Sequence, residues 1–372
     1  MKTDPEKSTG LYLHIPFCSV KCRFCDFAAY PGRLKDIPRY LAALAREIER
    51  RAREFPGRML DTFYVGGGTP SLLEPSDWRG LMAGVRAGFS TDPPWEASLE
   101  CNPDGVTAEK LAVWRELGIN RLSFGLQSDE PSLLAALGRT HSWEDFQHVF
   151  RAARAAGFSN LNADLMFGLP GQTRAGWART LGRVLELEPD HVSTYGLQVE
   201  ESTYFHRSGV QADDDLQADM YEDAANALET AGFIHYEISN FARPGFECRH
   251  NLRYWRNQPC LGAGVSAAWY DGTTRRTNTE DLTAYMESVE KNGVYDAEAV
   301  QLGPDQREGE NLMLALRLKE GVVPSAEALS LYGHVLYRSV REGLLLKEGD
   351  RYGPTRLGWR LSNRIFVDLL GK

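Results

Sequence analysis

The 372-residue sequence lacks any apolar run long enough to cross a membrane or to serve as a secretory signal peptide. Its first ten residues are polar and charged, and the apolar run that follows, residues 11–15, is short. From this absence we expect a protein that stays in the cytoplasm, with at most a peripheral association with a membrane.

The sequence also lacks a basic excess, because 42 Lys and Arg residues stand against 51 Asp and Glu, a net charge of -9. No basic cluster is visible, which argues against a nucleic-acid-binding surface. Cysteines are few, and three of the six, Cys101, Cys248 and Cys260, are scattered along the chain. That pattern argues against the disulfide framework of a secreted domain. With 42% hydrophobic residues, the chain can bury one large core and a smaller appendage.

The other three cysteines form a C-x3-C-x2-C motif at Cys18, Cys22 and Cys25. Thiolates at this spacing let one short loop hold a zinc ion or an iron-sulfur cluster. A structural zinc site needs a fourth ligand, which would have to be His14, Asp26 or a distant cysteine. A cubane [4Fe-4S] cluster on three cysteines instead leaves one iron open for chemistry. The spacing favours the cluster and leaves zinc as the alternative.

Between residues 10 and 200, six strand-like runs each precede a helical pattern, which is typical of a parallel sheet. The runs span residues 11–15, 62–65, 97–100, 121–126, 162–167 and 191–197. Six units are two short of a closed eight-stranded barrel, so we predict an α/β fold with a partial, TIM-like (βα)6 barrel. Ligands of such sheets bind at the carboxyl ends of the strands.

Candidate binding residues follow these strands. Each one also has an ordinary structural explanation as a turn, a helix cap or a satisfied polar group, but their gathering on successive units points to a ligand site. A triple-glycine run lies after the second strand, and polar residues lie at or after the third, fourth and fifth. The candidates are Gly67, Gly68, Thr69, Glu100, Gln127, Arg139, Asp164 and, in the sixth strand, Gly196.

At these residues the chain resembles the radical S-adenosylmethionine (radical SAM) superfamily, whose signature has an aromatic residue before the third cysteine, here Phe24. The resemblance implies that Cys18, Cys22 and Cys25 bind a [4Fe-4S] cluster and that the open iron takes the methionyl end of SAM. It further assigns Tyr12, which could equally be a core residue, and Phe24 to SAM, together with the strand-end residues just named.

A second informative stretch, H-N-x-x-Y-W, covers residues 250–255. His250 is a candidate axial haem ligand, with Tyr254 and Trp255 as a flat apolar surface and neighbouring arginines for propionates. A buried structural histidine is an equally good explanation from the residues alone. The motif resembles that of the heme chaperones called HemW, in the family of the anaerobic coproporphyrinogen III oxidase HemN, and this resemblance favours haem.

Beyond residue 300 we predict helices at 305–318, 326–342 and 356–370 and a two-stranded wing at 343–354, which together make a small winged-helix-like α+β domain. The predicted division is a radical SAM core at 1–240, a connecting segment with the HNxxYW motif at 241–300, and a HemN-type domain at 301–372.

The resemblance extends over nearly the whole chain and leaves several functions open. The decarboxylating branch of the family carries another cysteine two residues after the third ligand, where this chain has Phe27. We therefore expect a heme chaperone, rather than an enzyme, that carries haem to apo-cytochromes or other apo-proteins. The alternatives are coproporphyrinogen III dehydrogenase, a HemN-like radical SAM methyltransferase or cyclopropanase, and a zinc-stabilised barrel without redox chemistry.

Overall fold

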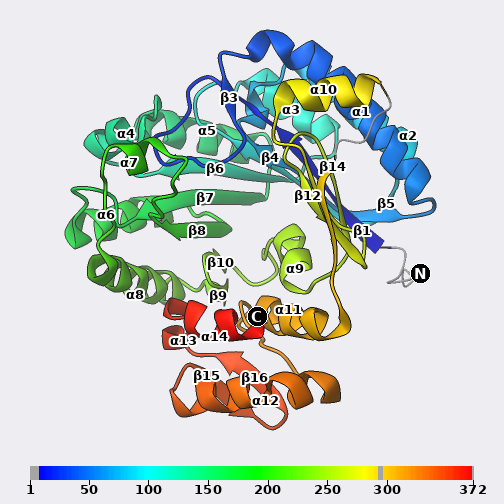
Figure 1. Ribbon diagram of the computed structural model, residues 1–372. Coiled ribbons are helices and arrows are strands. Elements are labelled where there is room, and N and C mark those ends of the chain that lie inside the picture. Colours follow the sequence, from blue (N-terminus) through cyan, green and yellow to red (C-terminus); the bar gives the residue numbers. More distant parts are fainter. Residues whose placement is uncertain (1–7, 292–295, 371–372) are drawn as a thin grey trace.

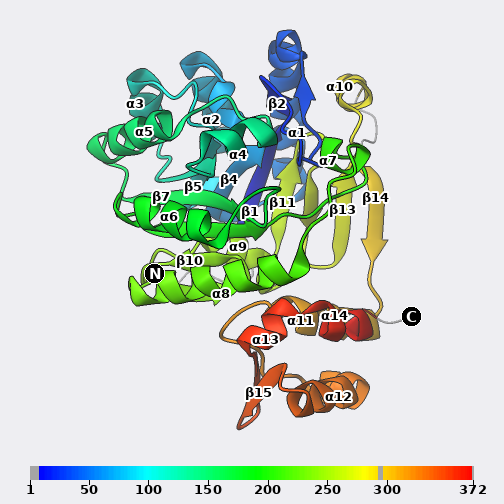
Figure 2. The same cartoon turned by 90° about the vertical axis from the view of Figure 1, so that its left-hand side faces the viewer.

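The computed structural model describes residues 8–291 and 296–370. Six strands pair in parallel and in chain order, as the sequence predicts. They are β1 (Ser8–Ile15), β4 (Met59–Gly67), β5 (Ser90–Cys101), β6 (Arg121–Gln127), β7 (Asn160–Phe167) and β8 (His191–Gly196). The outer helices are α1 (Ile37–Glu54), α2 (Pro75–Gly88), α3 (Ala108–Glu116), α4 (Pro131–Leu137), α5 (Trp143–Ala155), α6 (Arg174–Leu185) and α8 (Asp214–Thr230) (Figures 1 and 2). The predicted partial (βα)6 barrel is confirmed.

Both edges of the barrel are extended by strands that the sequence did not reveal. β11 (Cys260–Ala263) pairs in parallel with β1, and β12 (Ala268–Tyr270), β13 (Thr274–Asn278) and β14 (Asp296–Gln301) continue that edge in antiparallel pairs. At the other edge β10 (Asn240–Ala242) and β9 (Ile234–Glu237) follow β8. The predicted boundary between residues 240 and 241 falls inside β10, so segments on both sides of it share one sheet.

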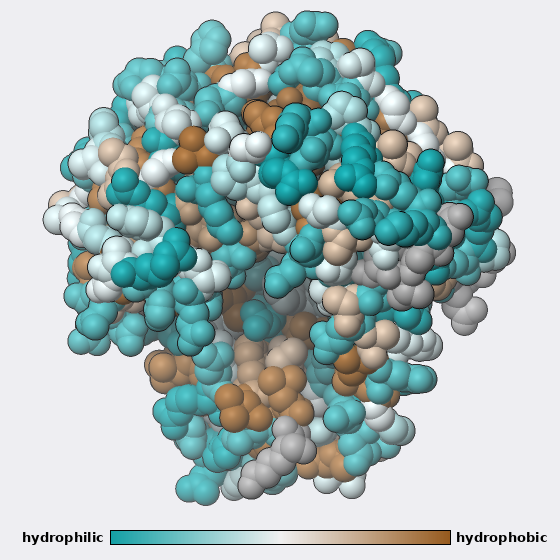
Figure 3. Space-filling model, turned by 45° about the horizontal axis from the view of Figure 1, so that its top comes forward, coloured by the Kyte–Doolittle hydropathy of each residue, from teal (hydrophilic) through white to brown (hydrophobic). Residues whose placement is uncertain are grey.

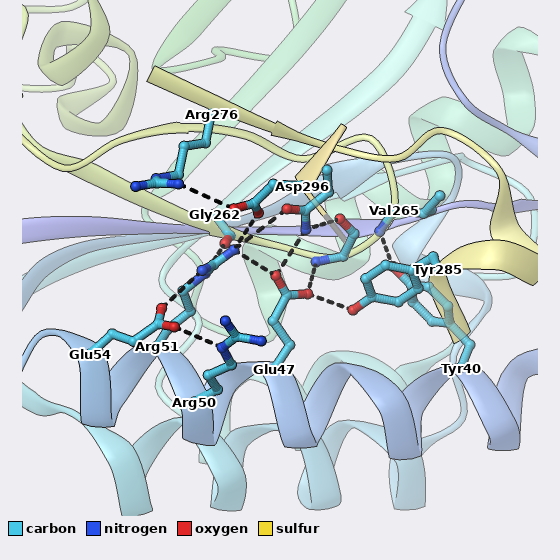
Figure 4. Close-up of polar contacts among 12 residues, drawn as sticks. Tyr40, Glu47, Arg50, Arg51, Glu54, Gly262, Val265, Arg276, Tyr285 and Asp296 are labelled. Atoms are coloured by element: carbon cyan, nitrogen blue, oxygen red, sulfur yellow. Dashed lines mark hydrogen bonds and ion pairs between the residues drawn. The ribbon is translucent and has the colours of Figure 1, made fainter. Parts of the chain in front are cut away.

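The helix α1 is amphipathic, as its apolar spacing predicts, and its buried face carries an ion pair as well as Leu44 and Ile48. Glu47 is completely buried and accepts from Arg51 Nη2 at 3.1 Å. Arg51 also donates to the Gly262 carbonyl of β11, and Tyr285 of α10 (Leu282–Glu290) donates to Glu47 (Figure 4). This network attaches the edge extension of the sheet to the first helix.

The C-terminal segment forms its own hydrophobic core below the barrel in Figure 1. It contains α11 (Pro304–Ala315), α12 (Ala326–Arg341), the hairpin of β15 (Leu345–Glu348) and β16 (Arg351–Pro354), α13 (Arg356–Arg360) and α14 (Asn363–Leu369). The prediction of one helix at 356–370 was wrong, because the segment forms two helices, α13 and α14, separated by Leu361 and Ser362. The break lets α13 pack beside β16 while α14 packs against α11 and α12.

The remaining elements are short. They are β2 (Phe17–Cys18), β3 (Tyr30–Pro31), the 3-10 turns η1 (Leu34–Asp36) and η2 (Pro70–Leu72), α7 (Tyr204–Arg207) and α9 (Arg249–Trp255), which contacts both β4 and α11. Figure 3 shows one hollowed face of the molecule, with hydrophobic residues on the lower rim of the hollow. Within residues 8–291 and 296–370, no helix combines the length and apolar character of a membrane span.

Candidate functional site

One cavity of about 550 Å³, within the size range of small-molecule sites, occupies the carboxyl-terminal side of the six strands. It collects twelve of the fourteen residues predicted for the cluster, SAM and haem. These lining residues are Cys18, Cys22, Phe24, Cys25, Gly67, Gly68, Thr69, Glu100, Gln127, Arg139, Asp164 and Gly196. Residues more than 170 positions apart in the sequence thus meet around one space.

The loop that carries the cysteines is fixed by backbone hydrogen bonds to distant elements. Arg23 N donates to the carbonyl of Leu137 at the end of α4, and its own carbonyl accepts from Phe205 N of α7. Phe24 packs against a small apolar cluster that includes Leu137 and Phe205. The loop therefore has a defined position relative to the strand ends.

The three cysteines are free thiols whose surroundings suit a thiolate-held cluster. Thr69 Oγ1 donates to Cys18 Sγ over 3.3 Å, and Arg139 Nη1 lies 3.4 Å from Cys22 Sγ. Donors aimed at sulfur stabilise thiolates and cluster sulfurs. Burial raises the pKa of the Cys25 thiol to about 11, so cluster assembly must displace its proton.

The fourth ligand that a zinc site would need does not come from His14. Both of its ring nitrogens lie 3.0 Å from other partners, the Tyr12 hydroxyl and the carbonyl of Ala28. His14 therefore keeps its own partners, and the three thiols of the loop are the donors that would hold a [4Fe-4S] cluster with one iron open.

The triple glycine is required by close packing. A Cβ atom on Gly67, whose φ is +109°, would lie 2.5 Å from the His14 ring, and one on Gly68 would lie 2.8 Å from the carbonyl oxygen of Phe17. Gly68 N donates to Ile15 and Thr69 N to Phe17. The glycines therefore seat the loop after β4 directly against the root of the cysteine loop, while Gly67 and Gly68 also line the cavity.

Two of the carboxylates that line the cavity come from the barrel strands β5 and β7. Glu100 accepts from the Tyr64 hydroxyl at 2.9 Å and from Gly67 N at 3.0 Å. Burial, with the nearby charge of Asp164, raises the pKa of Glu100 to about 7. Asp164 accepts from Ser123 and Asn162, and burial raises its pKa as well. The site can hold a ligand with a positive charge.

Gln127 and Arg139 line the cavity near the end of β6. Gln127 has a φ of +69°, rare for a residue with a side chain, at a bulge where the pairing of β6 with β7 shifts. Arg139 Nη2 donates to the Gly125 carbonyl at 2.7 Å and to Asn102 Oδ1 at 2.9 Å. The strained backbone of Gln127 indicates a functional constraint.

Comparison with known proteins identifies the family. The family model of the radical SAM superfamily matches residues 12–184. The heme chaperone HemW of Mycobacterium tuberculosis is 38% identical over 99% of this chain and 96% of its own length, and that of Bacillus subtilis is 34% identical over 97% and 99%. The chain belongs to the HemW family of the radical SAM superfamily. The HemW protein of Escherichia coli is 36% identical over 78% of this chain and 79% of its own length.

Among solved structures, coproporphyrinogen III oxidase (HemN) from Escherichia coli, described as a radical SAM enzyme, matches 99% of this chain and 91% of its own with a TM-score of 0.88 and 26% identity. HemW-family membership and this match confirm the resemblance seen in the sequence. Phe27, which replaces the additional cysteine of the decarboxylating branch, is 62% exposed and lines the cavity.

Two predicted residues of this HemW-family chain lie outside the cavity lining. The Tyr12 hydroxyl is 3.0 Å from His14 Nδ1, and its ring packs beside Tyr64. His250 is buried behind β4, where its ring nitrogens lie 3.0 Å from Thr62 Oγ1 and 3.1 Å from the Tyr254 hydroxyl. Burial lowers the pKa of His250 to about 3, so the ring is neutral. In this conformation neither nitrogen is free for iron.

Sequence reasoning missed several lining residues. Asn102 donates to Thr69 Oγ1 and accepts from Arg139 Nη2. Tyr64 and Arg121 also line the cavity, as does Asn251, the second residue of the HNxxYW motif. For Tyr64 a usable signal was the alternation of side chains along its strand, because Tyr64 lies on the same face of the strand as Thr62 and Gly66. For Asn251 the sequence contained no such signal.

Proposed function

We propose that this protein is a heme chaperone that binds haem as cargo and transfers it to apo-proteins, respiratory cytochromes among them. The similarity to HemW proteins over nearly the whole chain carries the proposal. The cavity supports it, because it combines the cysteine loop with the strand-end residues in one site. The protein acts in the cytoplasm and reaches membrane-bound recipients by peripheral association.

The cofactors are a [4Fe-4S] cluster and SAM. Cys18, Cys22 and Cys25 hold the cluster, which when bound supplies an open iron and an electron. Glu100, when ionised, pairs with the positively charged end of SAM, and Arg139 with its carboxylate. Phe24 offers an apolar ring to the adenine, and Gln127, Asp164 and the backbone at Gly196 complete the SAM site.

His250 remains the proposed haem ligand. Because both of its ring nitrogens are engaged, ligation requires that the contact with Tyr254 opens. The exposed Phe27 at the cavity mouth gives a porphyrin an apolar surface beside the cluster.

The test is anaerobic reconstitution with iron and sulfide, followed by separate titrations with haem and with coproporphyrinogen III. We expect a charge-transfer band in the visible spectrum, stoichiometric retention of haem and no loss of coproporphyrinogen. Carbon dioxide release over many turnovers would overturn the chaperone proposal, and colourless protein that retains zinc would overturn the cluster.

The second candidate is oxygen-independent oxidative decarboxylation of coproporphyrinogen III, favoured by the structural match to HemN. Phe27 argues against it. A Phe27→Cys variant offers a direct comparison, because restoring the thiol of the decarboxylating branch should still give no carbon dioxide if the chain is a chaperone.

A further inference from the structure

Arg121 lies at the inner end of the cavity. It is the first residue of β6, and Ser123 and Gly125 follow it on the same face and also line the cavity. Arg139 bonds the carbonyl of Gly125. Arg121 and Gly125 are four residues apart, a distance of about 13 Å along a strand. The two cationic side chains, Arg121 and Arg139, therefore lie at opposite ends of the cavity along β6.

The guanidinium of Arg121 has no hydrogen-bonding partner in the described part of the chain, although only 2% of the residue is exposed. Its Nε is buried without an acceptor. Arg51, also 2% exposed, instead bonds Glu47 and the Gly262 carbonyl (Figure 4). A guanidinium offers five N–H groups, and leaving them unsatisfied in the interior is costly.

The acids near Arg121 balance its charge at a distance but are bonded elsewhere. Glu96 interacts electrostatically with Arg121, yet its oxygens accept from the backbone N–H groups of Arg249 and His250 and from the Cys248 thiol. Glu100 and Asp164 accept from the groups described above. The N–H groups of Arg121 therefore stay available to a ligand.

A further polar residue of this cavity comes from α9. Asn251 lines the cavity, and its side chain makes no hydrogen bond to any described residue. It directly follows Arg249 and His250, whose backbone N–H groups donate to Glu96, an acid that interacts electrostatically with Arg121. A guanidinium and an amide together match a carboxylate.

We propose that Arg121, with Asn251, forms a carboxylate-binding subsite at the inner end of the cavity. The subsite deepens the proposed function, on which it rests for its ligands. Two ligands carry the required group: haem, as a propionate, and a SAM molecule other than the one whose carboxylate pairs with Arg139. The bidentate fork of arginine suits either one.

Binding of four probes to the cluster-loaded protein, measured anaerobically for the parent, Arg121→Met and Arg121→Lys, tests the subsite. The probes are SAM, decarboxylated SAM, haem and haem dimethyl ester. We expect Arg121→Met to lower the affinity for one carboxylate-bearing probe by roughly tenfold or more and to leave its carboxylate-free counterpart unchanged. The affected pair identifies the source of the carboxylate, and Arg121→Lys should retain part of the affinity.

Thermal unfolding of the ligand-free variants separates binding from structure. Arg121→Met removes a charge that no hydrogen bond from the described residues holds, so its Tm should fall less than that of Arg51→Met, which leaves the buried Glu47 without its charged partner. Unchanged affinity for all four probes would overturn the proposed subsite, because Arg121 would then contact neither ligand. Equal losses for all four with a lowered Tm would also overturn it. If the parent itself bound no haem, the chaperone proposal would fail while the SAM pair still tested Arg121.

Discussion

The hydroxyl of Tyr64 donates a 2.9 Å hydrogen bond to Oε1 of Glu100. The ring of the same tyrosine stacks on His250, with centroids 5.2 Å apart. Tyr64 therefore joins the carboxylate of the proposed SAM site to the histidine of the HNxxYW motif, and its hydrogen bond favours the ionised form of Glu100.

Replacing Tyr64 by Phe removes that hydrogen bond, which raises the pKa of Glu100 above its present value of about 7. If ionised Glu100 pairs with SAM, the variant should bind SAM several-fold more weakly at pH 7 and approach the parent at pH 9. Titration calorimetry from pH 6 to 9 checks this. Tyr332→Phe, whose hydroxyl bonds Asp305 in the C-terminal core, is the matched control. A pH profile identical to that of the parent would contradict the role of Glu100.

The contributions of Glu100 and Glu237 to stability should fall as the pH rises from about 4.5 to 7. Burial raises the pKa of both carboxyl groups to about 7, so over this range each keeps in the folded state a proton that it has lost in the unfolded state. Buried histidines such as His14 and His235, whose pKa burial lowers to about 4, contribute in the opposite direction. The test is therefore a comparison: urea unfolding at several pH values should show the free energy of unfolding rising more steeply with pH in Glu100→Gln and in Glu237→Gln than in the parent, and slopes identical to that of the parent would contradict the raised pKa values.

Gly68→Ala should block cluster assembly without unfolding the protein. The new Cβ would lie 2.8 to 2.9 Å from backbone atoms of residues 15–17, so the root of the cysteine loop must shift. We expect iron incorporation after reconstitution to drop several-fold. Gly80→Ala, in α2 with open space around it, is the control and should incorporate iron normally. Normal iron content in Gly68→Ala would show that the loop adapts.

Tyr254→Phe should strengthen haem binding if His250 is the ligand. The substitution removes the hydroxyl that lies 3.1 Å from Nε2 and so frees that nitrogen. His250→Ala should weaken haem retention, and the haem Soret band reports both changes. Tighter haem binding in Tyr254→Phe that persists when His250→Ala is added would exclude His250 as the ligand.

Glu47→Gln should lower stability by less than the roughly 3–5 kcal/mol of a fully uncompensated buried charge, because Glu54 and Asp296 still pair with Arg51, but by more than the loss of an exposed pair. On the exposed face of the same helix, Glu49 pairs with Arg53, and Glu49 is 67% exposed. Glu49→Gln should cost at most about 1 kcal/mol. Chemical denaturation of both variants gives the comparison, and equal losses would mean that the network in Figure 4 contributes little.

The parts of the fold that were predictable depend on local pattern. The six barrel strands carry continuous apolar runs, and the cysteine loop is defined by spacing within eight residues. Because parallel strands bring their carboxyl ends together, Gln127 and Asp164 could be placed at one end of the sheet from topology, whereas the assignment of Glu100 to SAM depended on the family resemblance.

What sequence could not supply depends on partners far along the chain. β11 pairs with β1, which lies 250 positions earlier in the chain, and nothing in residues 260–263 predicts that pairing. From the residues alone, a haem ligand and a buried structural histidine were equally good explanations of His250, because its contact with Thr62, 188 positions away, has no local signature. Arg121 read as an ordinary strand residue, since its burial without a partner follows from the packing of several other elements around it.

The sheet ends at β14 on one side and at β9 on the other, and in the described chain those two strands are not neighbours. A closed barrel has a fixed circumference, because widening it would break a row of hydrogen bonds between two strands. In this open sheet the two edge strands can move apart when the sheet bends, and no such row has to break. A rigid, flat macrocycle could therefore enter or leave from the side without disturbing the cysteine loop.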